Sequence, residues 1–268
     1  MIKIYKDYND IPASLNILSE GQTTKTHNVR IAMMRDKQYI KQADSQYKEA
    51  DVKEKLEALY NHKCAYCEQY VEQYHVEHYR PKKGYHNHDG QAHNGYYWIS
   101  LSWDNLMLSC PTCNICKGSL FDIQGKRKNL GKKKLDDDVN TWSLSYDQTE
   151  QPMLINPERE DPAGAFVYDK DGGIYPQANN ARAKYTIDTC NLNRRELRDA
   201  RRNILVEFIK DVIDALNSWQ NESERKIAIE TLTRQYMRRC KKPECEFLEF
   251  RNYATIFLKT ILAEIGEL

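Results

Sequence analysis

The sequence lacks long apolar runs and a dominant charge of either sign. No run of about 18 apolar residues occurs, so no transmembrane helix is expected. The opening residues, MIKIYKDYND, carry charges where a secretory signal needs an apolar stretch. An intracellular, cytoplasmic protein without a membrane partner is therefore expected. The 40 basic and 39 acidic residues nearly cancel to a net charge of +1, so total charge alone indicates no partner.

Internal repeats and low-complexity segments are also absent from the 268 residues, and a hydrophobic content of 40% excludes a wholly disordered chain. Basic side chains nevertheless gather locally, a pattern that suits a polyanion contacting one face of a protein. These groups are Arg80, Lys82 and Lys83; Lys126, Arg127, Lys128 and the lysines at 132–134; and Arg194, Arg195, Arg198, Arg201 and Arg202.

Apolar periodicity and turn residues predict an α+β chain. Its length leaves room for one large domain or two modest ones. We expect four successive parts: N-terminal helices packed on the core over 1–60, the core over 61–125, an irregular region with short strands over 126–190, and a helical region over 191–268.

Local patterns in the second half predict particular elements. The string DKDGG at 169–173 predicts a hairpin turn between two short strands. Asn193, with Glu196 three residues later, predicts a capping box at a helix start, because apolar residues then recur at helical spacing. Two further helices are predicted over 223–239 and 244–265.

Eight cysteines in a chain expected to be cytosolic indicate metal ligands or free thiols rather than disulfides. Cys64-x-x-Cys67 and Cys110-x-x-Cys113 have chelating spacing, and together they predict a closed tetrahedral site for structural zinc. Buried free cysteines or a redox pair are the alternative. Cys116 is expected to be a bystander thiol beside the second pair. The other cysteines, at 190, 240 and 245, lack partners at chelating spacing.

Residue types used in hydrolysis stand between and beside these pairs. The string HVEH occupies 75–78, Asn105 precedes the second pair, and Asn114 directly follows Cys113. This arrangement resembles the HNH, or ββα-metal, endonuclease family. In that family an acidic residue and a histidine stand on a hairpin, and a histidine or asparagine follows on a helix. The resemblance implies a zinc-stapled ββα-metal core that hydrolyses phosphodiester bonds.

The chemistry explains these residue types. A neutral imidazole is suited to taking a proton from water, and a hard divalent cation offsets charge on the phosphate. The resemblance implies that His78 is the general base, that Glu77 and Asn114 hold the cation, and that Asn105 orients the hairpin carrying the histidine. Carboxylate and carboxamide oxygens favour Mg²⁺ or Mn²⁺. The family more often has Asp at the position of Glu77.

Three cationic side chains near the motif are candidates for binding nucleic acid. Arg80, Lys82 and Lys117 are predicted to contact phosphates, with an ordinary solvated basic turn as the alternative for the first two.

The remaining histidines of this region have open roles. His75 shares a strand face with Glu77, which leaves metal ligation, a DNA contact, packing or an ordinary surface position as alternatives. The histidines at 86, 88 and 93 lie in a predicted loop over 85–95 and are expected to be incidental.

A closer resemblance extends over residues 50–205. It is carried by the strings KCAYCE, VEHYRPK, WDNL, INPE and LNRREL, which begin at residues 63, 76, 103, 155 and 192. They are similar to the PtuB-type HNH subunits of Septu anti-phage systems, which are also found beside certain retrons. The resemblance implies a nucleic-acid target, with DNA favoured and RNA possible, and a PtuA-like ATPase as partner.

Two other functions remain open. One is a stand-alone restriction-type HNH endonuclease, which needs its own sequence-reading element. The other is a non-catalytic, zinc-stabilised adaptor for nucleic acid or protein, in which the HNH residues are relics. Metal-dependent cleavage that is lost when His78 is replaced would exclude the adaptor.

Overall fold

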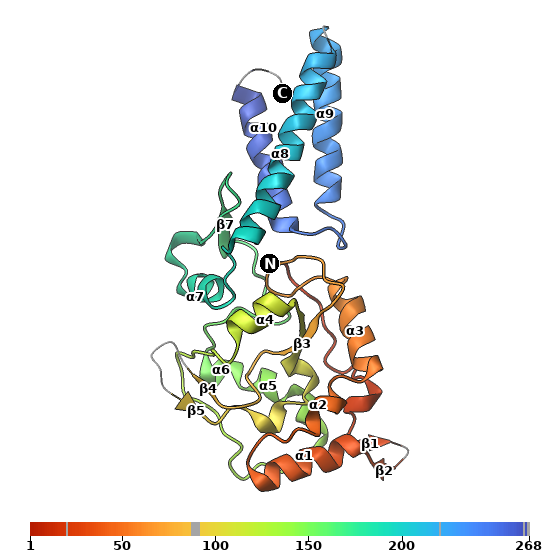
Figure 1. Cartoon of the computed structure of the whole chain (residues 1–268), viewed down its shortest axis with the longest axis vertical. Helices are drawn as coiled ribbons and strands as arrows, with labels where there is room; N and C mark the ends of the chain where they lie inside the picture. Colours follow the sequence, from red (N-terminus) through yellow and green to blue (C-terminus); the bar gives the residue numbers. More distant parts are fainter. Residues whose placement is uncertain (20, 87–91, 220, 265, 267–268) are drawn as a thin grey trace.

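Helices and four two-stranded antiparallel sheets build the described part of the chain. The computed structural model describes residues 1–19, 21–86, 92–219, 221–264 and 266. Figure 1 shows a rounded body from which three long helices rise as an arm. The predicted α+β class is confirmed. In the described part of the chain, no helix combines the length and apolar character needed to cross a bilayer.

The N-terminal part is mostly helical from residue 25 onward. Its elements are η1 (Ala13–Leu15), β1 (Leu18–Ser19), β2 (Gln22–Thr23), α1 (Lys25–Asp36), α2 (Ala43–Gln46) and α3 (Ala50–Tyr60). Val52, Leu56 and Tyr60 recur every fourth residue on α3 and are buried, which places one face of the helix in the core. That face packs beside β6, so the N-terminal part and the centre share one core.

Two antiparallel strands and one helix form the centre. These are β3 (His75–His78), β6 (Leu106–Ser109) and α4 (Pro111–Lys117). In the chain between β3 and β6 come β4 (Tyr85–His86), β5 (Ala92–His93), η2 (Tyr97–Ile99) and η3 (Trp103–Asn105). β3 pairs with β6, with His75 opposite Ser109 and His78 opposite Leu106. Every residue of β6 is buried, and α4 folds back against β3. This is the ββα order that the sequence predicted.

The region from 126 to 190 consists of short elements. These are η4 (Asp137–Thr141), α5 (Trp142–Ser145), α6 (Asp147–Glu150), β7 (Phe166–Tyr168), β8 (Ile174–Pro176), η5 (Gln177–Asn179) and α7 (Ala181–Thr189). The predicted hairpin is confirmed, because β7 pairs with β8. Asp169 Oδ1 accepts hydrogen bonds from the backbone N–H groups of Asp171 and Gly173, which closes the turn.

Three helices form the arm, close to the ranges predicted for them: α8 (Arg195–Ser218), α9 (Glu222–Arg239) and α10 (Leu248–Glu264). Their contact extends to a small distal cluster of Val212, Ile229 and Leu262. The predicted capping role of Asn193 is wrong, since Arg194 occupies the N-cap of α8. Both amide atoms of Asn193 instead bond to the backbone of Ile174 in β8.

Candidate metal centres and active site

The four cysteines of the two C-x-x-C pairs meet at one buried point. Their Sγ atoms all lie within 4.8 Å of one another, and Cys67 Sγ is 3.8 Å from Cys110 Sγ. Zinc–sulfur bonds of about 2.3 Å in a tetrahedron would place neighbouring sulfurs about 3.8 Å apart. The cluster is therefore able to bind a metal such as zinc. Among the described residues, Cys116 is not part of this group.

One arginine of the arm contacts this cluster. Arg194 donates to Cys113 Sγ at 3.3 Å and, through its other terminal nitrogen, to Cys67 Sγ and Cys110 Sγ at 3.7 Å each. A guanidinium beside several thiolates offsets their negative charge. Arg194 was predicted only as part of a basic cluster, and nothing in the sequence pairs it with cysteines 81 or more residues away.

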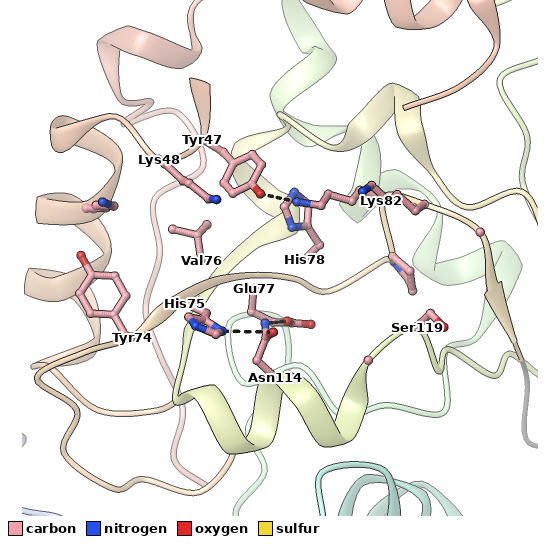
Figure 2. A pocket seen from close by; sticks show the side chains of 15 residues that line it. Tyr47, Lys48, Tyr74, His75, Val76, Glu77, His78, Lys82, Asn114 and Ser119 are labelled. Atoms are coloured by element: carbon pink, nitrogen blue, oxygen red, sulfur yellow. Dashed lines mark hydrogen bonds between the residues drawn. The ribbon is translucent and has the colours of Figure 1, made fainter. Parts of the chain in front are cut away.

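The cluster also fixes where α4 begins. Cys110 is the N-cap of this helix, and its Sγ accepts a hydrogen bond from the Cys113 backbone N–H at 3.3 Å. Asn114 follows immediately and turns toward β3, where its Nδ2 donates to Glu77 Oε2 (Figure 2). The structure thus brings together the two residues predicted to hold a catalytic cation.

Glu77 is a buried carboxylate, 3% exposed. Burial raises its pKa above the usual value, and the nearby Lys117 ammonium opposes this rise. Its Oε1 lies 2.6 Å from Lys117 Nζ but accepts no hydrogen bond of suitable geometry from the described residues. The Asn114 carboxamide, whose Nδ2 contacts Oε2, also carries an acceptor oxygen, Oδ1. These oxygen donors fit a hard divalent cation.

His78 lies on the opposite side of β3 from Glu77, beside Tyr47 and Lys82 (Figure 2). Its Nε2 is 2.8 Å from the carbonyl oxygen of Ser100. A carbonyl only accepts, so Nε2 carries the hydrogen and Nδ1 remains unprotonated. Burial lowers the pKa of His78 well below its usual value. The ring is therefore neutral at pH 7, the state that a general base requires.

Asn105 is fully buried and holds the chain just after His78. Its Oδ1 accepts from the Arg80 backbone N–H at 2.8 Å, and its Nδ2 donates to the Arg80 carbonyl at 3.0 Å. The Tyr79 N–H also donates to the Asn105 carbonyl at 3.0 Å. These contacts suit the orienting role that the resemblance implied.

Arg80 does not face this site. Its side chain is 0% exposed, and its guanidinium donates to Glu150 at 2.7 Å, Asp147 at 2.8 Å and Ser143 at 2.9 Å. The predicted phosphate contact is wrong here, because every terminal nitrogen is already bonded to α5 or α6. Arg80 instead fastens the centre of the body to these two helices.

Lys117 is also turned inward, with a side chain only 1% exposed. Its Nζ donates to the His78 carbonyl at 2.9 Å and pairs with Glu77. The predicted phosphate contact is therefore wrong for Lys117 as well. Its charge serves to stabilise a buried carboxylate and to tie α4 to β3.

Lys82 does reach the cavity beside the candidate site, which has a volume of about 490 Å³. Its Nζ donates to Tyr47 Oη and lies 3.3 Å from Asp44 Oδ1. Desolvation lowers the pKa of Lys82 to about 8, although Asp44 opposes this. Lys48 and Lys53 line the same cavity, although no motif in the sequence marked either of them as a site residue. In the sequence, only their positions could point to them: Lys48 lies just before α3, and Lys53 lies within it.

The histidines of this region separate into two groups. His75 lines the cavity with Glu77 and Asn114. The segment predicted as a loop over 85–95 contains two short strands, β4 and β5, whose backbones pair. His88 and the side chains of His86 and His93 lie outside the described residues, so their expected incidental role stays a prediction.

The fold and its two centres define an α+β protein with a tetracysteine cluster, in which a ββα unit carries a carboxylate, a histidine and an asparagine. The chain is homologous to Septu protein PtuB of Bacillus mycoides (strain KBAB4), with 30% identity over 181 residues. It is likewise 30% identical to Septu protein PtuA of the same strain over 159 residues. The predicted relationship to Septu proteins is therefore confirmed.

These relationships cover parts of each protein. The PtuB match spans 64% of this chain and 58% of the relative, and the PtuA match spans 57% and 20%. The chain thus spans less than two thirds of either relative. No family model matches the sequence.

Proposed function

We propose that this chain is a metal-dependent HNH endonuclease that hydrolyses phosphodiester bonds of nucleic acid, with DNA as the favoured target. One observation carries this proposal. Glu77 and Asn114 touch across β3 and α4, while the Ser100 carbonyl holds the adjacent His78 in the tautomer that leaves Nδ1 unprotonated. A carboxylate, a carboxamide and an oriented base are the groups that metal-assisted hydrolysis of a phosphodiester uses.

Each residue has a distinct task in this reaction. Glu77 and Asn114 would hold Mg²⁺ or Mn²⁺, and such a cation would offset the charge that develops on the phosphate. His78 Nδ1 accepts the proton of the attacking water, and the hydrogen bond from Nε2 to Ser100 keeps the ring oriented. Asn105 fixes the backbone that follows His78.

The four cysteines are proposed to hold zinc in a structural role. Their thiolates leave no open position for substrate, and the cluster sits at the start of the helix that carries Asn114. Zinc would thereby place one cation ligand relative to the strand that carries the other.

Nucleic acid is the substrate class that the cavity suits. Lys48, Lys53 and Lys82 line it, so three lysine ammonium groups would attract a phosphate that enters the cavity. Phosphate contacts do not distinguish DNA from RNA, and RNA remains the second candidate target.

We further propose that the chain is the effector subunit of a Septu-type anti-phage defence system. Homology to proteins named PtuB and PtuA supports this role. The resemblance then implies a PtuA-like ATPase as partner. Co-purification of the two chains from cells that express both would test that partnership, and separate elution at all salt concentrations would contradict it.

The nuclease proposal is tested by cleavage of supercoiled plasmid and of a labelled RNA by the zinc-loaded protein. Reactions contain Mg²⁺ or Mn²⁺, with EDTA as the metal control. Wild type is compared with His78→Ala, and with His27→Ala as a matched control on α1 outside the cavity. We expect cleavage to need the cation and His78 but not His27. Equal cleavage by His78→Ala would refute the assigned base, and tight binding without cleavage of either substrate would favour the adaptor.

A further inference from the structure

His75 lies beside the two proposed cation ligands on the same strand face. In β3, residues two apart point to the same side and lie about 7 Å apart at Cα. His75 and Glu77 are such a pair, and both border the cavity of about 490 Å³. Figure 2 shows their side chains on either side of Asn114, which rises from α4 between them.

The three side chains meet at one carboxamide. Asn114 Oδ1 is 3.4 Å from His75 Nδ1, and Asn114 Nδ2 donates to Glu77 Oε2. Adjacent ligand atoms around an octahedral cation, with bonds of about 2.1 Å, lie about 3.0 Å apart. The observed 3.4 Å between the imidazole nitrogen and the carboxamide oxygen is close to this separation.

Among the described residues, His75 makes one hydrogen-bond contact and no recorded ion pair or aromatic ring contact. His75 is exposed, and Asn114 is its only hydrogen-bond partner among the described residues. A histidine that served only to pack would be covered by apolar neighbours. This ring faces a polar cavity with one nitrogen turned toward a proposed cation ligand.

We infer that His75 is the third protein ligand of the catalytic cation, which makes the site a nitrogen donor plus two oxygen donors. The inference rests on the proposed nuclease function and concerns its metal. Imidazole suits transition ions, whereas Mg²⁺ prefers oxygen ligands alone and keeps several waters. The site therefore selects Mn²⁺ or a similar transition ion over Mg²⁺.

The test measures Mn²⁺ binding directly and needs no cleavage. Mn²⁺ is suitable because hard cations do not compete for a thiolate cluster that already holds zinc. The zinc-loaded protein is titrated with Mn²⁺, and free Mn²⁺ is followed by its electron paramagnetic resonance signal. Pulsed measurements on the bound ion then report whether an imidazole nitrogen coordinates it. Wild type is compared with His75→Gln, and with His27→Gln as the matched control.

We expect nitrogen coupling in wild type and in His27→Gln, and its loss in His75→Gln. Mn²⁺ affinity should fall about tenfold or more in His75→Gln, since even loss of an outer partner of a metal ligand weakens binding by about tenfold. The preference for Mn²⁺ over Mg²⁺ in cleavage should shrink in the same variant.

Two outcomes would overturn the inference. Nitrogen coupling that persists in His75→Gln would assign the ligand to another histidine, and Mn²⁺ bound without nitrogen coupling in wild type would leave an oxygen-only site. Either result is compatible with cleavage that depends on His78, so failure of this inference is distinguishable from failure of the proposed function. Wild type that binds no Mn²⁺ at concentrations supporting cleavage would refute the inference too.

Discussion

Replacing Arg80 by methionine should lower the stability of the folded protein and leave its affinity for nucleic acid unchanged. Methionine keeps the apolar stem but removes the cation that neutralises Glu150, whose side chain is 0% exposed. Breaking one partner of a buried ion pair costs about 3–5 kcal/mol, because the other charge stays buried. Glu150 still accepts hydrogen bonds from Tyr96 at 2.9 Å and from the Lys128 N–H at 2.8 Å, which favours the lower end of that range.

The expected loss converts to a measurable shift in melting temperature. At about 2.1 cal/mol/K per residue, unfolding of a chain of 268 residues has an entropy of about 0.56 kcal/mol/K. A destabilisation of about 3 kcal/mol therefore lowers the midpoint by about 5 °C. Thermal unfolding of the zinc-loaded protein, followed by circular dichroism, measures this shift.

Two further variants make the measurement decisive. Arg35→Met removes a solvent-exposed guanidinium that pairs with Asp36, and the midpoint should not move. Adding Glu150→Gln to Arg80→Met removes the stranded charge and should recover part of the loss. An Arg80→Met protein that has the melting temperature of wild type but binds DNA more weakly would refute the buried position of this side chain.

Three other predictions concern the buried charges and the metal cluster. Burial raises the pKa of Asp104 to about 7, so between about pH 4 and pH 7 the folded state holds a proton that the unfolded chain has released. Stability should therefore fall as pH rises across this window, and Asp104→Asn should flatten the dependence of melting temperature on pH; parallel curves would contradict this. Desolvation lowers the pKa of Lys82 to about 8, so binding of a labelled oligonucleotide by His78→Ala protein should weaken as pH rises through 8. Fluorescence anisotropy should show weaker binding without that dependence in Lys82→Met. Arg194 donates to three cysteine sulfurs, so Arg194→Gln should lose zinc to a chelator several-fold faster than wild type, and an unchanged rate would show that its charge does not protect the metal.

Several features of this protein were predictable because they depend on residues close together in the chain. The C-x-x-C spacing allows both thiolates of a pair to bind one metal ion, so two pairs predicted a four-cysteine cluster. The structure does bring all four cysteines together. The apolar spacing of α8 and the turn after β7 are local patterns of the same kind. The resemblance of the HVEH string to HNH enzymes indicated which residues to place around a cation, and Glu77 and Asn114 do meet.

Only the tertiary structure decided which basic side chains are buried and which line the cavity. Arg80, Lys82 and Lys117 look alike in the sequence, yet two of them are buried against carboxylates and only Lys82 reaches the cavity. Lys48 and Lys53 reach that cavity because α3 packs beside the central strands. A long charged side chain pairs with whichever opposite charge lies near it after the chain has packed. Burying a charge is tolerated only when an opposite charge compensates it. Those partners come from distant parts of the chain, and no local pattern encodes them.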